Sequence, residues 1–490
     1  MDYISTRGKA KATSSYAILK GIAPDGGLYV PVRFPGLFSE MPDIKALSYQ
    51  ELAYNVLSAF LTDYSADELK RCIASAYTDT FSGDVAPLVK VGQNYFLELF
   101  HGRTLAFKDV ALSLLPYLTM AAAEMNGLKE KPVILTATSG DTGKAALEAF
   151  ADVPNTYIVV FFPEDGVSDV QKLQMKTQAG ENVLVVGIDG NFDHAQSGVK
   201  AIFGDIGLNA NLQRRGYVLS SANSINIGRL LPQVVYYYYA YAQLLKNGDI
   251  VYGEEIDFTV PTGNFGNILA GWYAKETGLP IGRLICASNR NKVLYDFFNT
   301  QAYDKNRPFH KTASPSMDIL ISSNLERFLY HKCGDSEYIR NLMGSLAADG
   351  RFGFTTDQDI IGSFADEAEA RMAIKEVYEQ GYIIDPHTAV AYAAYKKVND
   401  TLRKNVVIAT ASPYKFAEEV TAAIVPYGYK ADSFEAIRRL SELAEMVGYE
   451  CAPPAIRELK NKPVLHNRVC TVEDMPNELL NFIASGQSLF

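Results

Sequence analysis

The stretch from Ile256 to Asn267 combines an apolar run with a turn that contains two glycines, and a helical pattern follows. Glycines let a ligand approach the backbone closely, and the N–H groups of such a turn and helix start form a cradle for anions. The turn therefore predicts a phosphate cup made by Gly263, Asn264, Phe265, Gly266 and Asn267. A plain strand-to-helix connection, which uses glycine for steric reasons alone, explains the turn equally well.

A second turn, Thr136–Lys144, also follows an apolar run and opens a helix. Ser139, Asp141 and Thr142 lie at this helix start, where side chains cap the first turn and amides bind anions. We expect these three residues to form a site for a carboxylate. A capped helix start without a ligand is the alternative.

The pair Gly143-Lys144 in the same turn suggests a nucleotide-binding P-loop, which would make the protein an ATPase or a nucleotide-dependent regulator. That motif needs glycine at position 138 and serine or threonine at position 145. The chain has Thr138 and Ala145 instead, so the match fails twice.

Lys108 stands at the end of an apolar stretch and at the head of a helix that runs toward Met120. A lysine amine becomes a nucleophile when desolvation or a cationic neighbour lowers its pKa. On residue type alone, an exposed lysine is the commoner outcome. Thr410, after the apolar run Val406–Ala409, and His387 offer further polar groups, for which structural roles are the commoner expectation.

Short apolar runs alternate with helical stretches through the middle of the chain, as in Pro132–Thr136, Thr156–Phe162, Val183–Ile188, Asp257–Val260 and Val406–Ala409. This alternation predicts an α/β fold with parallel sheets that helices cover on both faces. Ligands bind such sheets beyond the carboxyl ends of the strands, where the turns described above lie. We expect the first 80 or so residues to form a separate small module of helices and turns.

Composition excludes several classes of protein. The 490 residues are 48% hydrophobic and 21% charged, which is typical of a globular chain. A net charge of −10 disfavours binding to nucleic acid or an anionic membrane. Five scattered cysteines without a C-x-x-C pair indicate neither a disulfide framework nor a metal site. Because no secretory leader or membrane-spanning run is visible, we expect a cytoplasmic protein.

The order of these motifs along the chain and the residues within them resemble the threonine synthase family of fold-type II pyridoxal-phosphate enzymes. The resemblance extends from the first residues to about Glu419. It is carried by Gly21–Pro31, His101–Asp109, Ala137–Gly143, Asp189–Asp193, Asn223–Asn226, Pro261–Asn267, Ser314–Asp318, Ser323–Arg327 and Asp385–Val390.

The resemblance implies two αβα lobes of three layers each, with mostly parallel twisted sheets, and an added N-terminal module. It implies domain bounds of 1–90 for the module and 91–425 for the catalytic region, whose smaller lobe spans about 105–220. Residues 426–490 would complete the large lobe. The assembly expected is a monomer or a weak homodimer.

The resemblance also implies an activity, the conversion of O-phospho-L-homoserine and water to L-threonine and phosphate. Lys108 would form a Schiff base with pyridoxal phosphate and, once freed, act as the general base. Residues 263–267 would hold the cofactor phosphate, and Thr410 would face the pyridine nitrogen. Ser139, Asp141 and Thr142, at a helix start, are the best candidates for binding the substrate carboxylate. Ser221, Asn226 and Arg229 are candidates for the substrate phosphate, although a helix-surface position explains Arg229 equally well.

Four positions depart from the family's usual residues: Arg103, Lys144, Gly228 and Ser412. They leave open how the substrate phosphate is held, and Arg103 and Lys144 are candidates for it. Another fold-type II lyase, such as a serine/threonine dehydratase or a phospho-lyase, is the nearest alternative function. A scaffold that binds the cofactor without turnover is disfavoured by the retained Lys108.

Overall fold

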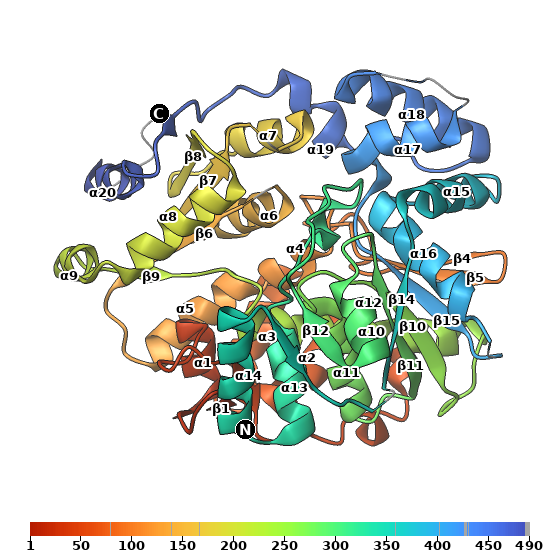
Figure 1. Cartoon of the computed structure of the whole chain (residues 1–490), viewed down its shortest axis with the longest axis horizontal. Coiled ribbons are helices and arrows are strands. Elements are labelled where there is room, and N and C mark those ends of the chain that lie inside the picture. Colours follow the sequence, from red (N-terminus) through yellow and green to blue (C-terminus); the bar gives the residue numbers. More distant parts are fainter. Residues whose placement is uncertain are drawn as a thin grey trace.

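The computed structural model describes residues 1–490 except 79, 139, 166, 358, 401, 426–428, 430 and 486–490. Within these residues, two larger sheets with helices on both faces form the body of the molecule, and a small N-terminal sheet packs beside them (Figure 1). None of the described helices combines the length and the apolarity that crossing a bilayer requires.

The first larger sheet is entirely parallel, in the order β16-β8-β7-β6-β9. Its side chains alternate between two buried faces, which is why its strands are continuous apolar runs. Leu135 and Val159 pack on the side of α8, α9 and α20, whereas Ile134 and Ile158 pack on the side of α6. The bounds are β6 Lys131–Ala137, β7 Tyr157–Pro163, β8 Val183–Ile188, β9 Tyr217–Ser220, β16 Val469–Cys470, α6 Asp141–Phe150, α8 Phe192–Gly204, α9 Ile206–Arg214 and α20 Met475–Ser485.

The second larger sheet has the order β14-β11-β10-β15-β5-β4 and is parallel except for the edge pair β4–β5. Phe258 packs with the helices α10 and α11, and Val407 lies in the core formed with α15 and α16. The bounds are β4 Leu88–Val91, β5 Asn94–Glu98, β10 Ile256–Pro261, β11 Ile281–Ser288, β14 Ile360–Phe364, β15 Asn405–Ala409, α10 Ile227–Asn247, α11 Gly266–Glu276, α15 Glu367–Tyr378 and α16 Pro386–Val398.

The N-terminal segment forms the antiparallel sheet β2-β1-β3 and three helices, of which α2 begins with a capping box of Ser48 and Glu51. Its apolar side chains join the core that contains α10 and α5. The buried Arg327 guanidinium donates to the carbonyl oxygens of Tyr29 and Ile225 and thereby ties this segment to the larger sheet's helices. The bounds are β1 Tyr3–Ser5, β2 Lys11–Ala12, β3 Tyr29–Pro31, α1 Ser14–Lys20, α2 Tyr49–Phe60, α3 Ala66–Ala76 and α5 Leu115–Met125.

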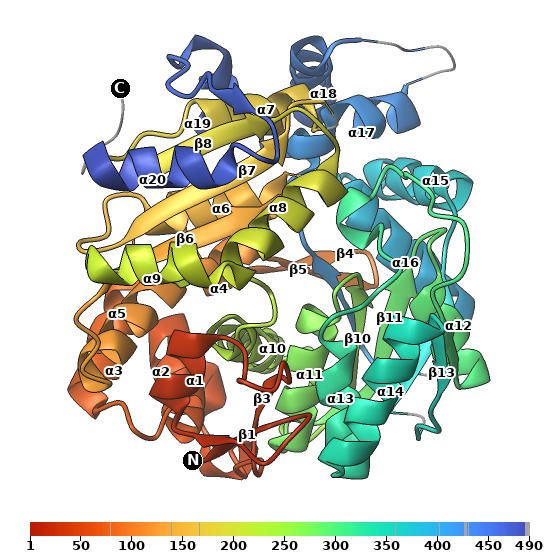
Figure 2. The same ribbon diagram turned by 60° about the vertical axis from the view of Figure 1, so that its left-hand side comes forward.

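The C-terminal segment, expected to complete the large lobe, contributes elements to both larger sheets. Its strand β16 extends the five-stranded sheet beside β8, and α20 packs against α8 (Figure 2). Its helices α18 and α19 and the turn η5 instead place side chains in the core with α15 and α17. The remaining elements are α4 Lys108–Leu112, α7 Asp169–Lys176, α12 Val293–Thr300, β12 Ala302–Asp304, α13 Leu325–Cys333, α14 Ser336–Ala348, β13 Arg351–Gly353, α17 Ala417–Ile424, α18 Ser433–Val447, α19 Pro454–Arg457, and the 3-10 turns η1 Phe38–Glu40, η2 Ile44–Ala46, η3 Pro315–Met317, η4 Pro413–Phe416 and η5 Leu459–Asn461.

Candidate active site

Three neighbouring strands bring the predicted chemistry to one edge of the six-stranded sheet. The strands β5, β15 and β10 are adjacent and parallel, so their carboxyl ends face the same way. β5 leads toward Lys108, β15 leads to Thr410, and β10 leads to the glycine turn at 263–267. Thr410 is held against the Lys108 segment, because the Phe107 amide donates to its carbonyl oxygen at 2.8 Å.

Lys108 is the first residue of α4 and is almost buried, with 12% of its side chain exposed. Its Nζ lies 3.8 Å from Asp141 Oδ2 and 3.5 Å from the hydroxyl of Ser316. Burial lowers the pKa of the Lys108 amine to about 8, Asp141 opposes that shift, and Lys415 and Arg229 add to it. Part of the Lys108 amine is therefore neutral and nucleophilic near neutral pH.

Asp141 connects the two sheets at this point. It begins α6 on the five-stranded sheet, and its Oδ1 lies 2.8 Å from Nζ of Lys415, which follows β15 of the other sheet. Gln171 also donates to Oδ1 at 2.8 Å. Burial opposes ionisation of Asp141, but Lys415 and Lys108 outweigh it and hold its pKa well below the usual range. The carboxylate is thus a fixed negative charge between two lysines.

The glycine turn forms an open cradle of amides. Phe265 adopts a left-handed conformation (φ 64°) ahead of α11, and no side chain caps that helix. In the described part of the chain, the amides from Gly263 to Ile268 donate to no protein acceptor. At Gly263 a Cβ atom would lie 2.4 Å from the Ser316 carbonyl oxygen, so only glycine fits there. Unsatisfied amides at a helix start are suited to an anionic group such as a phosphate.

Asn267 turns its side chain away from solvent. Its Oδ1 accepts hydrogen bonds from the hydroxyls of Tyr236 and Tyr237, each at 2.7 Å. Its Nδ2 is buried and has no hydrogen-bond partner within the described ranges of the chain. A buried, unpaired amide donor beside the cradle fits a site that takes an acceptor-rich ligand.

The helix start of α6 offers a second cradle. Thr138 Oγ1 accepts the amides of Gly140 and Gly143, whereas the amides of Asp141 and Thr142 donate to no described acceptor. Because Asp141 commits its carboxylate to Lys415, it can serve an anionic ligand only through its amide. The predicted residue Ser139 lies outside the described residues.

Arg229 is buried near Lys108 and forms no ion pair with a carboxylate in the described chain. Its Nη1 donates to the Ala222 carbonyl oxygen at 2.8 Å, and its Nε has no hydrogen-bond partner among the residues described. Burial lowers its pKa to about 10, which still leaves it charged near neutral pH. An uncompensated buried cation of this kind favours an anionic ligand.

Asn226 and Ser221, the other residues predicted to hold the substrate phosphate, bond to the backbone. The side-chain Oδ1 of Asn226 accepts the Gly228 amide at 2.9 Å and so caps α10. The side-chain Nδ2 of Asn226 donates to the Ile18 carbonyl oxygen, also at 2.9 Å. Ser221 Oγ accepts the amide of Asn223 at 3.2 Å. Asn226 therefore has little left to offer a ligand, and its observed role is a helix cap.

Two of the four departures from the family pattern share one partner. Lys144 Nζ lies 2.9 Å from Glu148 Oε2 and also bonds Gln178, and Arg103 Nη1 lies 3.3 Å from Glu148 Oε1. Both cations therefore pair with a carboxylate of the protein itself, and Lys144 is not placed as the lysine of a nucleotide-binding P-loop.

The other two departures have steric and local reasons. A Cβ atom at Gly228 would lie 2.9 Å from the end of the Leu115 side chain, so a larger residue would require that side chain to shift. Ser412 accepts the amide of Tyr414 and caps the turn η4.

Sequence reasoning missed Lys415 and Ser316 and expected only a cap or core contact for His387. In the structure His387 accepts the Ser316 amide at 3.1 Å through Nε2, and Ser316 contacts Lys108. Ser314–Asp318 carried part of the family resemblance, and that signal could have drawn attention to Ser316.

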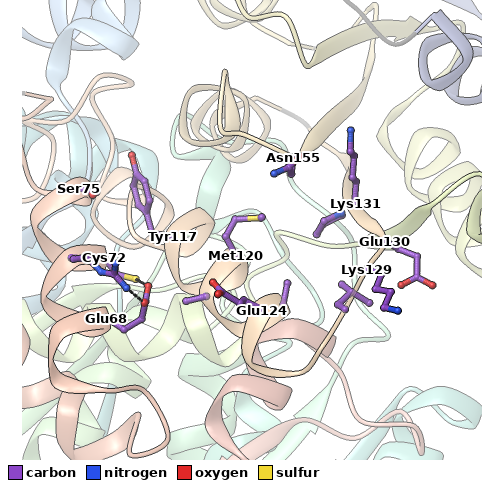
Figure 3. A pocket seen from close by; sticks show the side chains of 15 residues that line it. Glu68, Cys72, Ser75, Tyr117, Met120, Glu124, Lys129, Glu130, Lys131 and Asn155 are labelled. Atoms are coloured by element: carbon purple, nitrogen blue, oxygen red, sulfur yellow. Dashed lines mark hydrogen bonds and ion pairs between the residues drawn. The ribbon is translucent and has the colours of Figure 1, made fainter.

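A separate hollow of about 640 Å³ lies between α3, α5 and the amino end of β6. Figure 3 shows charged side chains around it, among them Glu68, Glu124, Lys129 and Lys131. None of the predicted site residues lines it. The hollow is at the opposite end of β6 from the helix start of α6 and plays no part in the site.

Family models match nearly the whole chain. Residues 2–77 match the model described as threonine synthase N terminus, and residues 86–412 match pyridoxal-phosphate dependent enzyme. Residues 388–475 match threonine synthase, C-terminal.

Individual relatives agree with these models. Threonine synthase of Pseudomonas aeruginosa is 39% identical over 90% of this chain and 96% of its own length. Human threonine synthase-like 1 is 38% identical over 94% of this chain, which spans 64% of that longer protein.

Solved structures show the same similarity. The pyridoxal-phosphate-bound threonine synthase of Brucella melitensis has a TM-score of 0.84 at 36% identity and covers 98% of this chain and 99% of its own. The yeast threonine synthase has a TM-score of 0.87 at 32% identity and covers 99% of both chains.

Proposed function

The chain belongs to the threonine synthase family of pyridoxal-phosphate-dependent enzymes, and from this premise we propose that it converts O-phospho-L-homoserine and water to L-threonine and phosphate. One observation carries the proposal. The buried amine of Lys108 lies at the same sheet edge as a cradle of amides, Gly263 to Ile268, that have no acceptor among the residues the structure describes.

The residues present fit the cofactor. Lys108 would join it covalently, and the amides of residues 263–268 would hold its phosphate. Thr410 would face the ring nitrogen with a neutral hydroxyl. When bound, pyridoxal phosphate supplies an electron sink that makes loss of an amino acid's Cα proton feasible.

The Lys108 amine is suited to act as the general base. A pKa of about 8 leaves part of the amine neutral and still basic near neutral pH. When it takes the Cα proton, the C–H bond breaks, an N–H bond forms at Nζ, and the electron pair stays on the substrate side. Asp141 Oδ2, at 3.8 Å, stabilises the ammonium that results.

The substrate's two anionic groups have separate partners in this proposal. The amides of Asp141 and Thr142, with Ser139 as the remaining candidate, would bind the carboxylate at the start of α6. Arg229 would bind the phosphate, because it is a buried cation that no described carboxylate pairs with. Water is a reactant, so the groups that bind substrate must leave one place for it.

The test compares products. The purified protein with pyridoxal phosphate should release threonine and inorganic phosphate in equal amounts from O-phosphohomoserine. Formation of an oxoacid and ammonia from serine or threonine instead would favour a dehydratase. ATP hydrolysis without threonine formation would contradict the proposal.

A further inference from the structure

Ser316 occupies a position between the amine and the cradle of the proposed site. It lies in the 3-10 turn Pro315–Met317, and its hydroxyl accepts a long contact of 3.5 Å from Lys108 Nζ. Its carbonyl oxygen approaches Gly263 so closely that a Cβ there would lie 2.4 Å away. A single residue therefore contacts the reactive amine with its side chain and the cradle with its backbone.

A buried pair, His387 and Asp385, fixes the backbone of Ser316. The Ser316 amide donates to His387 Nε2 at 3.1 Å, and His387 Nδ1 lies 2.6 Å from Asp385 Oδ2. His387 is 2% exposed and Asp385 is fully buried. Because Nε2 accepts from an amide, the imidazole proton is on Nδ1 and points to Asp385. Asp385 in turn caps α16 through the amides of His387 and Thr388.

We propose that Ser316 is a further catalytic residue of the reaction proposed above, and that His387 is the positioning residue that holds it. The Ser316 hydroxyl accepts one N–H of Lys108 and so turns the lone pair of the freed amine toward the substrate. The inference rests on the proposed function. It adds a role for a hydroxyl that the assignments of Lys108, the amide cradle and Arg229 do not use.

The first experiment is a double-mutant cycle on the loaded enzyme. Ser316→Ala should lower kcat about tenfold with KM within about twofold, as expected for one hydrogen bond to a reacting group. His387→Leu should have a similar effect, because it releases the Ser316 amide. His387→Gln, which keeps an acceptor near the Nε2 position, should recover most of the loss.

Non-additivity is the decisive outcome. If both residues act through one position, Ser316→Ala combined with His387→Leu should lose no more than Ser316→Ala alone. Fully additive losses, or an unchanged kcat in Ser316→Ala, would overturn the inference. Ser58→Ala is a matched control, because that hydroxyl bonds a carbonyl oxygen within its own helix, α2.

A second experiment uses protein without cofactor. The pH dependence of Lys108 labelling by trinitrobenzenesulfonate, followed by peptide mass spectrometry, reports the pKa of the amine. Asp141, Lys415, Arg229 and Asp109 also act on this amine and are kept unchanged. Because the Ser316 hydroxyl accepts from the ammonium, Ser316→Ala should lower the midpoint by about half a unit.

An unmoved midpoint would contradict the contact between Ser316 and Lys108. The labelling also separates the two proposals. If the wild-type chain makes no threonine while the midpoint still shifts, the proposed function fails and the contact stands. Should His387→Leu not fold, Ser316→Ala and His387→Gln still decide the outcome.

Discussion

Lys415 and Asp141 form an ion pair at 2.8 Å, although Lys415 follows a strand of the six-stranded sheet and Asp141 begins a helix on the five-stranded sheet. The side chain of Lys415 is fully buried and also donates to the Thr104 carbonyl oxygen at 2.7 Å. The pair therefore links the two halves of the molecule beside the Lys108 amine.

Breaking this pair should destabilise the protein strongly. Asp141→Asn leaves Lys415 as an uncompensated buried charge, so the free energy of unfolding should fall by about 3 kcal/mol or more. Urea denaturation would measure it. Asp141→Asn combined with Lys415→Met should recover much of the loss, and Glu435→Gln, at an exposed ion pair with Arg438, should change stability by less than about 1 kcal/mol.

The same carboxylate predicts how stability depends on pH. The pKa of Asp141 is lowered in the folded state, so its contribution is present above the unfolded-state pKa of about 4 and is lost as the pH falls below it. The difference in unfolding free energy between wild type and Asp141→Asn should shrink from pH 6 to pH 3. A difference that stays constant over this range would show that the depressed pKa is incorrect.

Arg229 should control the affinity for phosphate. Arg229→Met removes a buried cation without removing a salt bridge, so inorganic phosphate should inhibit the variant about tenfold less well or worse. Arg229→Lys should keep part of the affinity, and the exposed Arg33→Met should change nothing. Equal inhibition of Arg229→Met and wild type would remove Arg229 from the phosphate site.

A neutral residue at position 410 should direct the type of reaction. Thr410→Asp would place a carboxylate where the ring nitrogen is proposed to lie, and so favour ring protonation and transamination. Product analysis should then show more oxoacid and more aminated cofactor relative to threonine. An unchanged product profile would show that Thr410 does not face the ring.

Lys108 should be indispensable. Lys108→Ala should abolish both the visible absorbance of the covalently joined cofactor and threonine formation. Lys108→Arg keeps the positive charge near Asp141 but lacks a primary amine, so it should be equally inactive. Absorbance spectra and product assays on both variants check this, and full activity in either would refute the role of Lys108.

The sequence was sufficient to predict the parallel α/β architecture, because strands such as Val183–Ile188 are buried on both faces and therefore continuously apolar. It also predicted the open turn at 263–267, since glycines after a strand are a local signal. The convergence of Lys108, Thr410 and that turn followed from placing all three at the carboxyl ends of parallel strands. Their assigned roles remain predictions.

Contacts between distant segments could not be predicted. Lys415 meets Asp141, and His387 meets Ser316, only after two sheets and a long loop are in place. The ion pair of Lys144 and Glu148 could have been predicted from the sequence, because residues four apart on a helix have neighbouring side chains. The second cation on Glu148, Arg103, again required the fold.

The bonds of Arg327 to Tyr29 and Ile225 have a consequence for engineering. Deleting the first thirty residues would remove the Tyr29 acceptor from a charged group that water cannot reach, so a shortened protein would be expected to aggregate rather than work at a reduced rate. Chimaeras between relatives are therefore better joined at surface loops that leave intact this arginine and the segments around Tyr29 and Ile225.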